Sequence, residues 1–481
     1  MFPRSFSRSF LLGLGFAVVA LAPLAAADTA RRGQTETALD RYVAAPDPSH
    51  SWTKVTEAGD ATGTAYVLDL VSQTWLTPAE VNRPEWRHWL VVIKPAELKH
   101  STALLFISGG SNRPGNPPRP SRNLIDIARA TGSVVAELRM VPNQKLVFHG
   151  DGKEREEDDL IAYTWKQYLK TGDERWPARL PMTKAAVRAM DTITAFLATP
   201  AAGNAKVDSF VVAGGSKRGW TAWTTAAVDR RVVGVAPIVI DVLNVEVSMR
   251  HHYRAYGFYA PSVGDYVRHG IMAWTGTPEL AALYAIEDPF SYRDRLTLPK
   301  LVVNAGGDQF FLPDSARHFF GALSGQKHLR TIPNTDHGLK DSDAYQTLTA
   351  WYHALLNRRP TPELTWKLDP AGTLTATTSV APKSVLLWQA HNPAARDFRM
   401  ETLGPVWKST PVDGDGKTYA AKIEKPAAGW TASFLELSYN VGAGVPLKLT
   451  TEVFVTPDTL PFAAPNEPQP KGFLQNAAAK K

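Results

Sequence analysis

Short runs of apolar, largely β-branched residues recur between residues 88 and 334, and helix-like segments separate several of them. The runs cover residues 88–95, 103–110, 132–138, 209–215, 232–240, 300–308 and 329–334, and the helical patterns cover 121–131, 157–170, 182–198 and 313–323. The runs are apolar almost throughout, which is typical of strands covered on both faces, as in parallel sheets. Alternating strands and helices predict an α/β layer fold with a mostly parallel sheet and helices on both faces.

Two segments depart from this alternation. Residues 241–288 form a long stretch rich in Tyr, Trp and His between two expected core strands, and an insertion of that length usually makes a lid over a site. Further on, short β-like runs between turn residues predict a β-sandwich domain over 364–460. We therefore expect an α/β domain over 61–358, a linker of low regularity over 28–60, and a disordered tail over 461–481.

The beginning of the chain has the pattern of a secretory signal peptide. Arg4 and Arg8 make a basic start, an apolar run follows, and the small residues Ala25, Ala26 and Ala27 come at its end. This pattern predicts a signal peptide over 1–27 that is cleaved after Ala27, and hence a periplasmic or secreted protein. A membrane anchor is the alternative, because the apolar run is almost long enough to span a bilayer.

The composition of the chain excludes several types of catalytic chemistry and several kinds of binding partner. The chain has no cysteine, which excludes a cysteine nucleophile, thiolate-bound zinc and iron–sulfur clusters. The formal net charge of +7 predicts at most weak contact with an anionic envelope surface, and no basic cluster interleaved with aromatic residues indicates nucleic-acid binding. His251, His252 and His318 lack carboxylate partners at metal-ligand spacing. We expect no metal and no organic cofactor.

The stretch "VVAGGSKRGWTAW" is the strongest candidate for a reactive site. A buried strand ends in Gly214 and Gly215, Ser216 follows, and an apolar helix begins near Lys217. A serine on such a sharp strand-to-helix turn projects its hydroxyl above the carboxyl edge of the sheet, as in the G-x-S-x-G nucleophile elbow. Here the second glycine falls one residue late, because Arg218 occupies a position that is normally small. An ordinary strand–turn–helix corner is the alternative.

A serine needs a base to remove its proton, and for this type of fold the expected chain order is Ser, Asp, His. Asp308 follows a predicted core strand in "NAGGDQFF", and His337 follows the last predicted strand in "PNTDHGL". Three strand ends thus supply the residue types of a triad in the required order. Asp308 could instead cap a following helix, as Asp314 could, and His337 could bond a turn; Asp336 is a weaker orienting acid.

Candidates for the oxyanion hole and for substrate binding lie in the turn after Ser216, in the loop at Gly110 and in the insertion. The backbone N–H of Lys217 and an N–H near Gly110 or Ser111 are candidates for an oxyanion hole. The cation Arg218 could bind an anionic substrate or simply reach solvent. Tyr253 and Tyr256 in "HHYRAYGFYAP" could bind substrate or pack the lid.

At these residues the chain resembles the PhoPQ-activated pathogenicity-related protein family (PqaA-like proteins) of the α/β-hydrolase group. The stretches that carry the resemblance lie between about residues 50 and 455 and include "SQTWLTP", "EDDLIAYTWKQYL", "RLPMTKAAVRAMDTI", "GGSKRGWTAW" and "PNTDHGL". Gln309 stands where the family's "GDEFF" has an acid. The resemblance implies an exported α/β-hydrolase-like protein with Ser216, Asp308 and His337 at the matching catalytic positions. A second likeness, to the "GCSRxG" elbow of glucuronoyl esterases, covers only the serine turn.

These observations predict an exported serine hydrolase that cleaves an ester, amide or peptide bond of a small-molecule or peptide substrate through an acyl-enzyme. One alternative is a binding protein that uses the same fold to recognise an envelope ligand or peptide without turnover. Another is a carbohydrate esterase of the glucuronoyl type.

Overall fold

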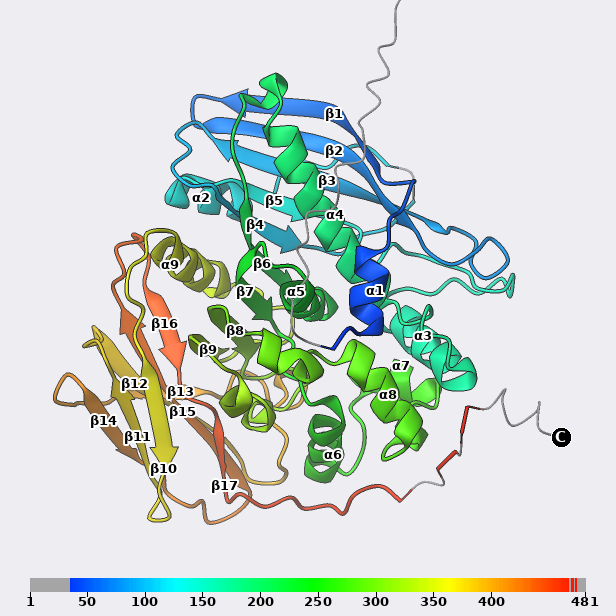
Figure 1. Ribbon diagram of the computed structural model, residues 1–481. Coiled ribbons are helices and arrows are strands. Elements are labelled where there is room, and N and C mark those ends of the chain that lie inside the picture. The colour runs from blue at the N-terminus through cyan, green and yellow to red at the C-terminus, as the bar shows by residue number, and fades with distance from the viewer. Residues whose placement is uncertain (1–34, 114, 467–468, 471, 474–481) are drawn as a thin grey trace, which may run out of the picture.

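The computed structural model describes residues 35–113, 115–466, 469–470 and 472–473, so the expected signal peptide over 1–27 lies outside the described residues. A central sheet has the strand order β1-β2-β3-β5-β4-β6-β7-β8-β9 (Figure 1). Its strands are β1 (Ser51–Asp60), β2 (Gly63–Thr74), β3 (Glu85–Pro95), β4 (Thr102–Ile107), β5 (Val135–Leu138), β6 (Ser209–Gly215), β7 (Val232–Ile238), β8 (Lys300–Ala305) and β9 (Lys327–Ile332).

The sheet is parallel in its larger part. Strands β5, β4, β6, β7, β8 and β9 pair in parallel, whereas β1, β2 and β3 form an antiparallel edge and β3 runs antiparallel to β5. The expected α/β fold is confirmed. The run at 88–95 is a strand, but an antiparallel one, since burial on both faces makes a strand apolar whichever way its neighbour runs.

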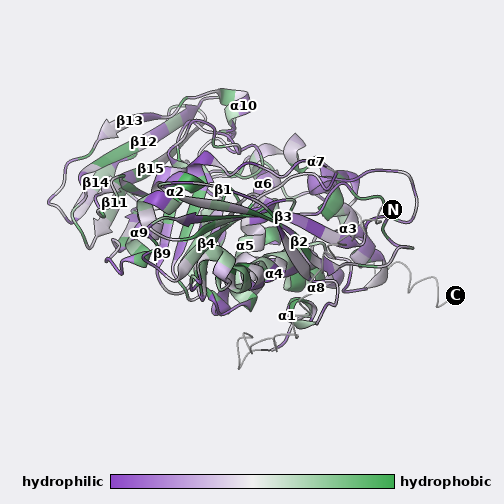
Figure 2. Cartoon of the chain, turned by 90° about the horizontal axis from the view of Figure 1, so that it is seen from above, coloured by the Kyte–Doolittle hydropathy of each residue, from purple (hydrophilic) through white to green (hydrophobic). Residues whose placement is uncertain are grey.

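Helices cover both faces of this sheet. One face carries α1 (Ala38–Ala44), α4 (Arg179–Leu197) and α5 (Lys217–Val228), which contact one another and share a core (Figure 2). The other carries α2 (Arg122–Thr131) and α9 (Ala344–Leu356). Helix α3 (Glu157–Thr171) lies nearer the site and, like α2, ends at a glycine in the left-handed conformation (Gly172 and Gly132), a common way for a helix to stop.

Between β7 and β8 the chain forms a helical insertion. Its helices are α6 (Val245–Tyr256), α7 (Gly264–Arg268) and α8 (Pro278–Glu287), with 3-10 turns at Pro261–Val263, Met272–Trp274 and Pro289–Arg295. This segment occupies the place of the expected lid at 241–288. Among the described residues, no helix has the length and apolar character that a bilayer crossing requires.

The C-terminal region consists of antiparallel sheets. One sheet has the order β10-β11-β14, and the other has the order β13-β12-β15-β16, with β17 paired to β15. The strands are β10 (Leu364–Leu368), β11 (Thr373–Thr378), β12 (Ser384–Asn392), β13 (Lys408–Pro411), β14 (Thr418–Lys422), β15 (Trp430–Tyr439), β16 (Leu447–Thr450) and β17 (Phe454–Thr456); a short helix, α10 (Met400–Leu403), follows β12. Buried side chains of both sheets form one core with those of α9, so this region packs directly on the α/β layer.

Three segments differ from their sequence-based descriptions. Residues 38–60 form α1 and β1 instead of a linker of low regularity. Residues 313–323 contain two 3-10 turns, Ser315–His318 and Phe320–Ala322, instead of a helix. The tail over 461–481 was expected to be disordered, but two of its described residues make contacts with the rest of the protein. The N–H of Phe462 donates to the carbonyl of Arg254, and the Phe473 ring packs edge-on against Tyr168, 5.8 Å between centroids.

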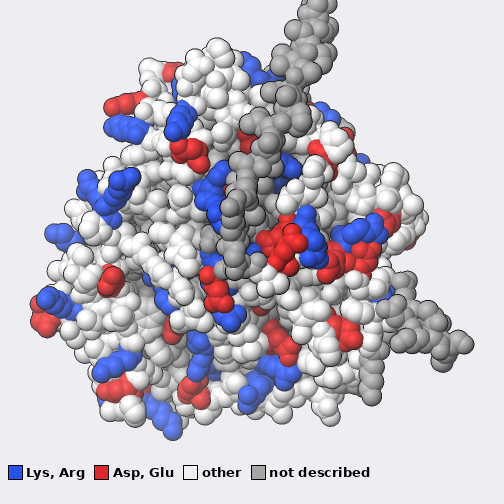
Figure 3. Space-filling model, viewed as in Figure 1, with Lys and Arg blue, Asp and Glu red and all other residues white. Residues whose placement is uncertain are grey.

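Charges are spread over the surface. On the face shown in Figure 3, basic and acidic side chains alternate without a large patch of one sign. Many are paired at short range, as in Arg175 with Glu80 and Asp173.

Candidate active site

Ser216 lies on a strained turn between β6 and α5. Its φ of 56° and ψ of −129° belong to a region that side-chain-bearing residues rarely adopt. The turn is held from the neighbouring strand, because the N–H of Ser216 donates to the carbonyl of Ile238 at 2.8 Å. This is the geometry of a nucleophile elbow.

Two glycines allow the helix to approach the strand at this turn. A Cβ at Gly214 would lie 2.7 Å from the carbonyl oxygen of Arg218, and a Cβ at Gly219 would lie 2.7 Å from the carbonyl oxygen of Gly214. Both contacts are with backbone, which cannot move aside cheaply. The glycine that comes one residue late in the sequence therefore provides the close helix–strand contact.

Asp308 and His337 are joined by a hydrogen bond at the ends of β8 and β9. His337 Nδ1 is 2.8 Å from Oδ2 and 3.1 Å from Oδ1 of Asp308. The Asp308 carboxylate is buried and also accepts from the N–H of Phe310 at 2.8 Å. Asp336 is exposed and accepts instead from the N–H of Gly338. Of these two carboxylates, only Asp308 orients the imidazole.

Two aromatic rings pack against the His337 imidazole. His337 Nε2 is buried and has no hydrogen-bond partner within the described part of the chain, so a bond to Ser216 is not formed in this conformation. The Phe310 ring lies 4.4 Å from the imidazole and the Phe311 ring 5.8 Å, measured between centroids. Ser216, Phe310 and Phe311 line the same pocket. Catalytic hydrogen bonds are often long before substrate binds.

The two cations after the serine are both paired with carboxylates of α3. The Arg218 guanidinium bonds Glu157 at 2.8 and 2.5 Å, and Lys217 Nζ bonds Glu157 at 2.8 Å and Asp158 at 3.1 Å. Burial alone would raise the pKa of Glu157, but the hydrogen bonds from Arg218 and the nearby charges outweigh it and hold the pKa well below its usual range. Arg218, expected as a substrate contact, is thus occupied by Glu157.

The predicted oxyanion donors lie at adjoining strand ends. Lys217 is the first residue of α5, and its N–H has no acceptor within the helix. Gly110 and exposed Ser111 follow β4, whose Ile107 pairs with Gly214 of β6. A Cβ at Gly109 would collide with Arg218 Nη2, so this loop packs against the guanidinium. The two loops therefore border the same edge of the sheet.

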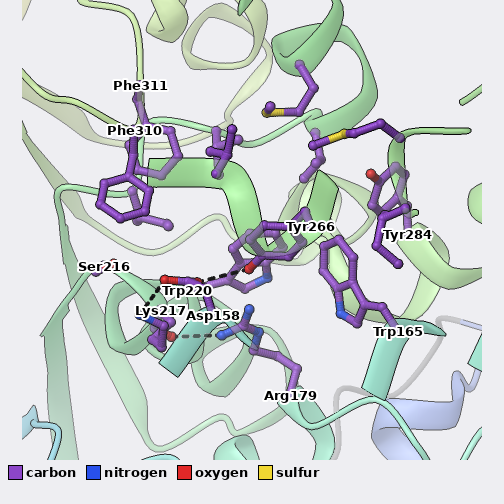
Figure 4. Close-up of a pocket in the computed structure, with 17 residues that line it drawn as sticks. Asp158, Trp165, Arg179, Ser216, Lys217, Trp220, Tyr266, Tyr284, Phe310 and Phe311 are labelled. Carbon is purple, nitrogen blue, oxygen red and sulfur yellow. Dashed lines mark hydrogen bonds and ion pairs between the residues drawn. The ribbon is translucent and has the colours of Figure 1, made fainter. Parts of the chain in front are cut away.

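A pocket with about 580 Å³ of empty space, part of it open to solvent, adjoins Ser216 (Figure 4). The helical insertion supplies much of its wall, including Met249, Tyr266 and Tyr284. Tyr253 and Tyr256 are not among the lining residues: Tyr256 is buried with the Arg399 guanidinium 5.1 Å from its ring centroid, and Tyr253 packs against Tyr259. Among the described residues, no group of three or more His, Asp or Glu side chains is placed to hold a metal.

A family described as PhoPQ-activated pathogenicity-related protein matches residues 39–399. The chain belongs to this family. It is also similar to the autocrine proliferation repressor protein A of Dictyostelium discoideum, with 37% identity over 463 residues, 90% of this chain and 92% of that protein. The expected family membership is confirmed.

Solved structures similar to this member of the PhoPQ-related family include several esterases. The acetyl xylan esterase from Paenibacillus sp. R4 has a TM-score of 0.46 at 14% identity, covering 68% of this chain and 98% of its own. The glucuronoyl esterase from Solibacter usitatus has a TM-score of 0.37 at 15% identity, covering 66% of this chain and 90% of its own.

The structure of this PhoPQ-related protein shows contacts for residues to which the sequence assigned no role. Gln309 Oε1 accepts from the backbone N–H of His337 at 3.1 Å, so an amide does here what a carboxylate oxygen could also do. Asp241 is buried near Asp308, and burial, followed by the charge of Asp308, raises its pKa well above the usual range. Arg179, on α4, lines the pocket floor. No sequence signal sets it apart from Lys184 and Arg188, the other cations of the same helix.

Proposed function

We propose that this chain is a serine hydrolase in which Ser216 attacks a carbonyl carbon and forms an acyl-enzyme. The observation that carries the proposal is the Asp308–His337 hydrogen bond, at the same sheet edge as a serine on a strained strand-to-helix turn. This combination supports the roles of a triad: a serine on a strained turn as the nucleophile, a histidine as the base, and a buried carboxylate that orients the histidine.

In the proposed mechanism, the substrate enters the pocket and the Ser216 hydroxyl rotates toward His337 Nε2. As Oγ attacks, Nε2 takes the proton, and the buried Asp308 carboxylate keeps Nδ1 protonated and stabilises the imidazolium. The N–H groups of Lys217 and of Gly110 or Ser111 bind the oxyanion. His337 then protonates the leaving group, and water releases the acyl group by the same steps in reverse order.

The bond cleaved is an ester, amide or peptide bond, since the triad serves all of them. The geometry favours a group without an exposed negative charge next to the serine, because Lys217 and Arg218 are both engaged by carboxylates. We also propose that the protein is exported and loses residues 1–27, on the strength of the basic and apolar start of the chain.

A fluorophosphonate probe tests the proposed nucleophile. We expect the wild-type protein to be labelled, Ser216→Ala to lose the label, and the matched control Ser111→Ala to retain it. Folded protein that is never labelled would contradict the proposal and favour a binding protein without turnover. For protein that does label, p-nitrophenyl esters compared with aminoacyl anilides then assign the bond type.

A further inference from the structure

The walls of the pocket beside Ser216 are aromatic. The polar atoms of two of these rings are engaged, since Trp220 Nε1 donates to the carbonyl of Glu287 and Tyr266 donates to Asp158, whereas Trp165 Nε1 has no hydrogen-bond partner in the described part of the chain. Trp165 packs against Trp220, Tyr266 and Tyr284 with ring centroids 6.1, 5.2 and 5.7 Å apart. The Tyr266 hydroxyl donates to Asp158 at 3.1 Å, and Lys217 Nζ binds the same carboxylate (Figure 4). Such a cavity fits a flat apolar group better than a polar one.

One donor on the floor of this cavity is not satisfied. The Arg179 side chain is 1% exposed; its Nε bonds Glu287 at 3.2 Å and its Nη1 bonds the carbonyl of Lys217 at 3.0 Å. Nη2 is buried without a hydrogen-bond partner in the described part of the chain. In Figure 4 the guanidinium points up toward the rings of Trp220 and Tyr266, on the cavity side. A buried charged donor left unpaired is costly, so an acceptor within the pocket would stabilise it.

The position of Arg179 relates this donor to the reacting serine. Nη1 is bonded to the carbonyl of Lys217, the residue that follows Ser216, and the guanidinium stacks 4.4 Å from the centre of the Trp220 ring. Ser216, Trp220 and Arg179 also line the same pocket, so one ligand can contact both the serine and the arginine.

We propose that the pocket selects substrates in which an aryl group next to the scissile carbonyl carries an uncharged oxygen acceptor at its far end, and that Arg179 Nη2 binds this oxygen. The inference deepens the proposed function and depends on it for the identity of the scissile bond. A neutral acceptor fits because each cation at the floor already has a carboxylate partner: Glu287 for Arg179 and Asp158 for Lys217. Arg179 is then a specificity-determining residue.

Binding, measured without turnover, tests this assignment. Ser216→Ala protein is titrated calorimetrically with 4-acetylbenzamide and with its 4-isopropyl analogue, which has a similar shape but no acceptor at the far end of the ring. We expect the acetyl compound to bind at least about tenfold more tightly, as one additional charge-assisted hydrogen bond allows. Equal affinities, or no binding of either compound, would overturn the proposal; equal affinities would mean that water alone satisfies Nη2.

A variant without the buried ion pair provides the control. Arg179→Met alone would leave Glu287 buried and unpaired, so it is combined with Glu287→Gln and checked for folding by urea titration. In this background we expect the two ligands to bind within about twofold of each other. A preference retained there would assign the acetyl oxygen to another group and overturn the role of Arg179. Fluorophosphonate labelling of the wild type reports on the proposed nucleophile separately.

Discussion

Glu157 pairs with both cations of the nucleophile turn, Lys217 and Arg218. Replacing Glu157 is therefore the sharpest test of this charge cluster. Glu157→Gln removes the negative charge but keeps the shape, and it turns an amide N–H₂ toward Arg218, whose guanidinium makes two hydrogen bonds to the native carboxylate. Arg218 and Lys217 are nearly buried, with side chains 11% and 7% exposed. Arg218 would then be buried without a counter-charge.

The magnitude follows from the burial of these partners. Breaking a fully buried ion pair costs about 3–5 kcal/mol of unfolding free energy. Two features reduce the loss here: the Glu157 side chain is 39% exposed, and Lys217 keeps Asp158. We therefore expect a loss of about 2–3 kcal/mol at pH 7.

Urea unfolding followed by tryptophan fluorescence measures the effect. The control is Glu154→Gln, because Glu154 pairs with Arg113 and both side chains are at least half exposed; we expect a loss below about 0.5 kcal/mol for that variant. The low pKa of Glu157 means that its contribution is present at neutral pH and declines once the pH falls below about 4.5, where the unfolded chain takes up the proton. A Glu157→Gln loss no larger than that of the control at pH 7 would refute the account of the cluster.

Three further predictions concern the turn, the base and the acid stability of the fold. Gly219→Ala should lower the free energy of unfolding, measured in urea, by about 1–3 kcal/mol, because the new Cβ would lie 2.7 Å from a backbone oxygen. Gly215→Ala should lower it far less, because no atom lies within 4 Å of a Cβ at that position. Similar losses in the two variants would contradict the argument that Gly219 is needed for the close helix–strand contact. Gln309→Leu should slow fluorophosphonate labelling about tenfold, because the backbone N–H of His337 loses its acceptor. Gln309→Glu keeps an acceptor oxygen and should be labelled at the wild-type rate. Equal labelling rates in the two variants would contradict this role of Gln309. Burial lowers the pKa of His88 and His328 to about 4 and of His252 to about 3, so below pH 6.5 the unfolded chain binds protons that the folded chain does not. Stability should therefore fall as the pH drops from 6.5 to 4, and His88→Asn should reduce that slope by about 1.4 kcal/mol per pH unit, with exposed His391→Asn as the unchanged control.

The sequence predicted the six strands of the parallel part of the sheet, whose residues are mostly buried, but not the buried helix α9. Strand β6 has the bounds expected from "SFVVAGG", because a strand covered on both faces must be apolar along its length. Strand β1 gave no such signal: it is the sheet edge, and nearly all of its residues are exposed. Strand β1 forms through backbone pairing with β2. Because its side chains are exposed, that pairing requires no hydrophobic pattern in its sequence.

Long-range contacts explain why other features were missed. The segment at 313–323 does not continue as a helix; within it, the buried carboxylate of Asp314 binds His251 and Arg396 instead of capping a helix. Asp308 and His337 were identifiable because each lies in the loop that follows a parallel strand, and the carboxyl ends of parallel strands meet at one edge. Arg179 and Glu287 could not be paired from the sequence, since their 108-residue separation is closed only by the packing of α4 against the insertion.

The central claim is that His337 activates Ser216 for attack on a carbonyl. Peptide mass spectrometry after fluorophosphonate treatment, with the labelling rate measured in wild type and in His337→Gln, tests it most directly. We expect one adduct, on Ser216, formed at least about a hundredfold more slowly when His337 is replaced. An adduct on a different serine, or an unchanged rate at Ser216 without His337, would contradict it.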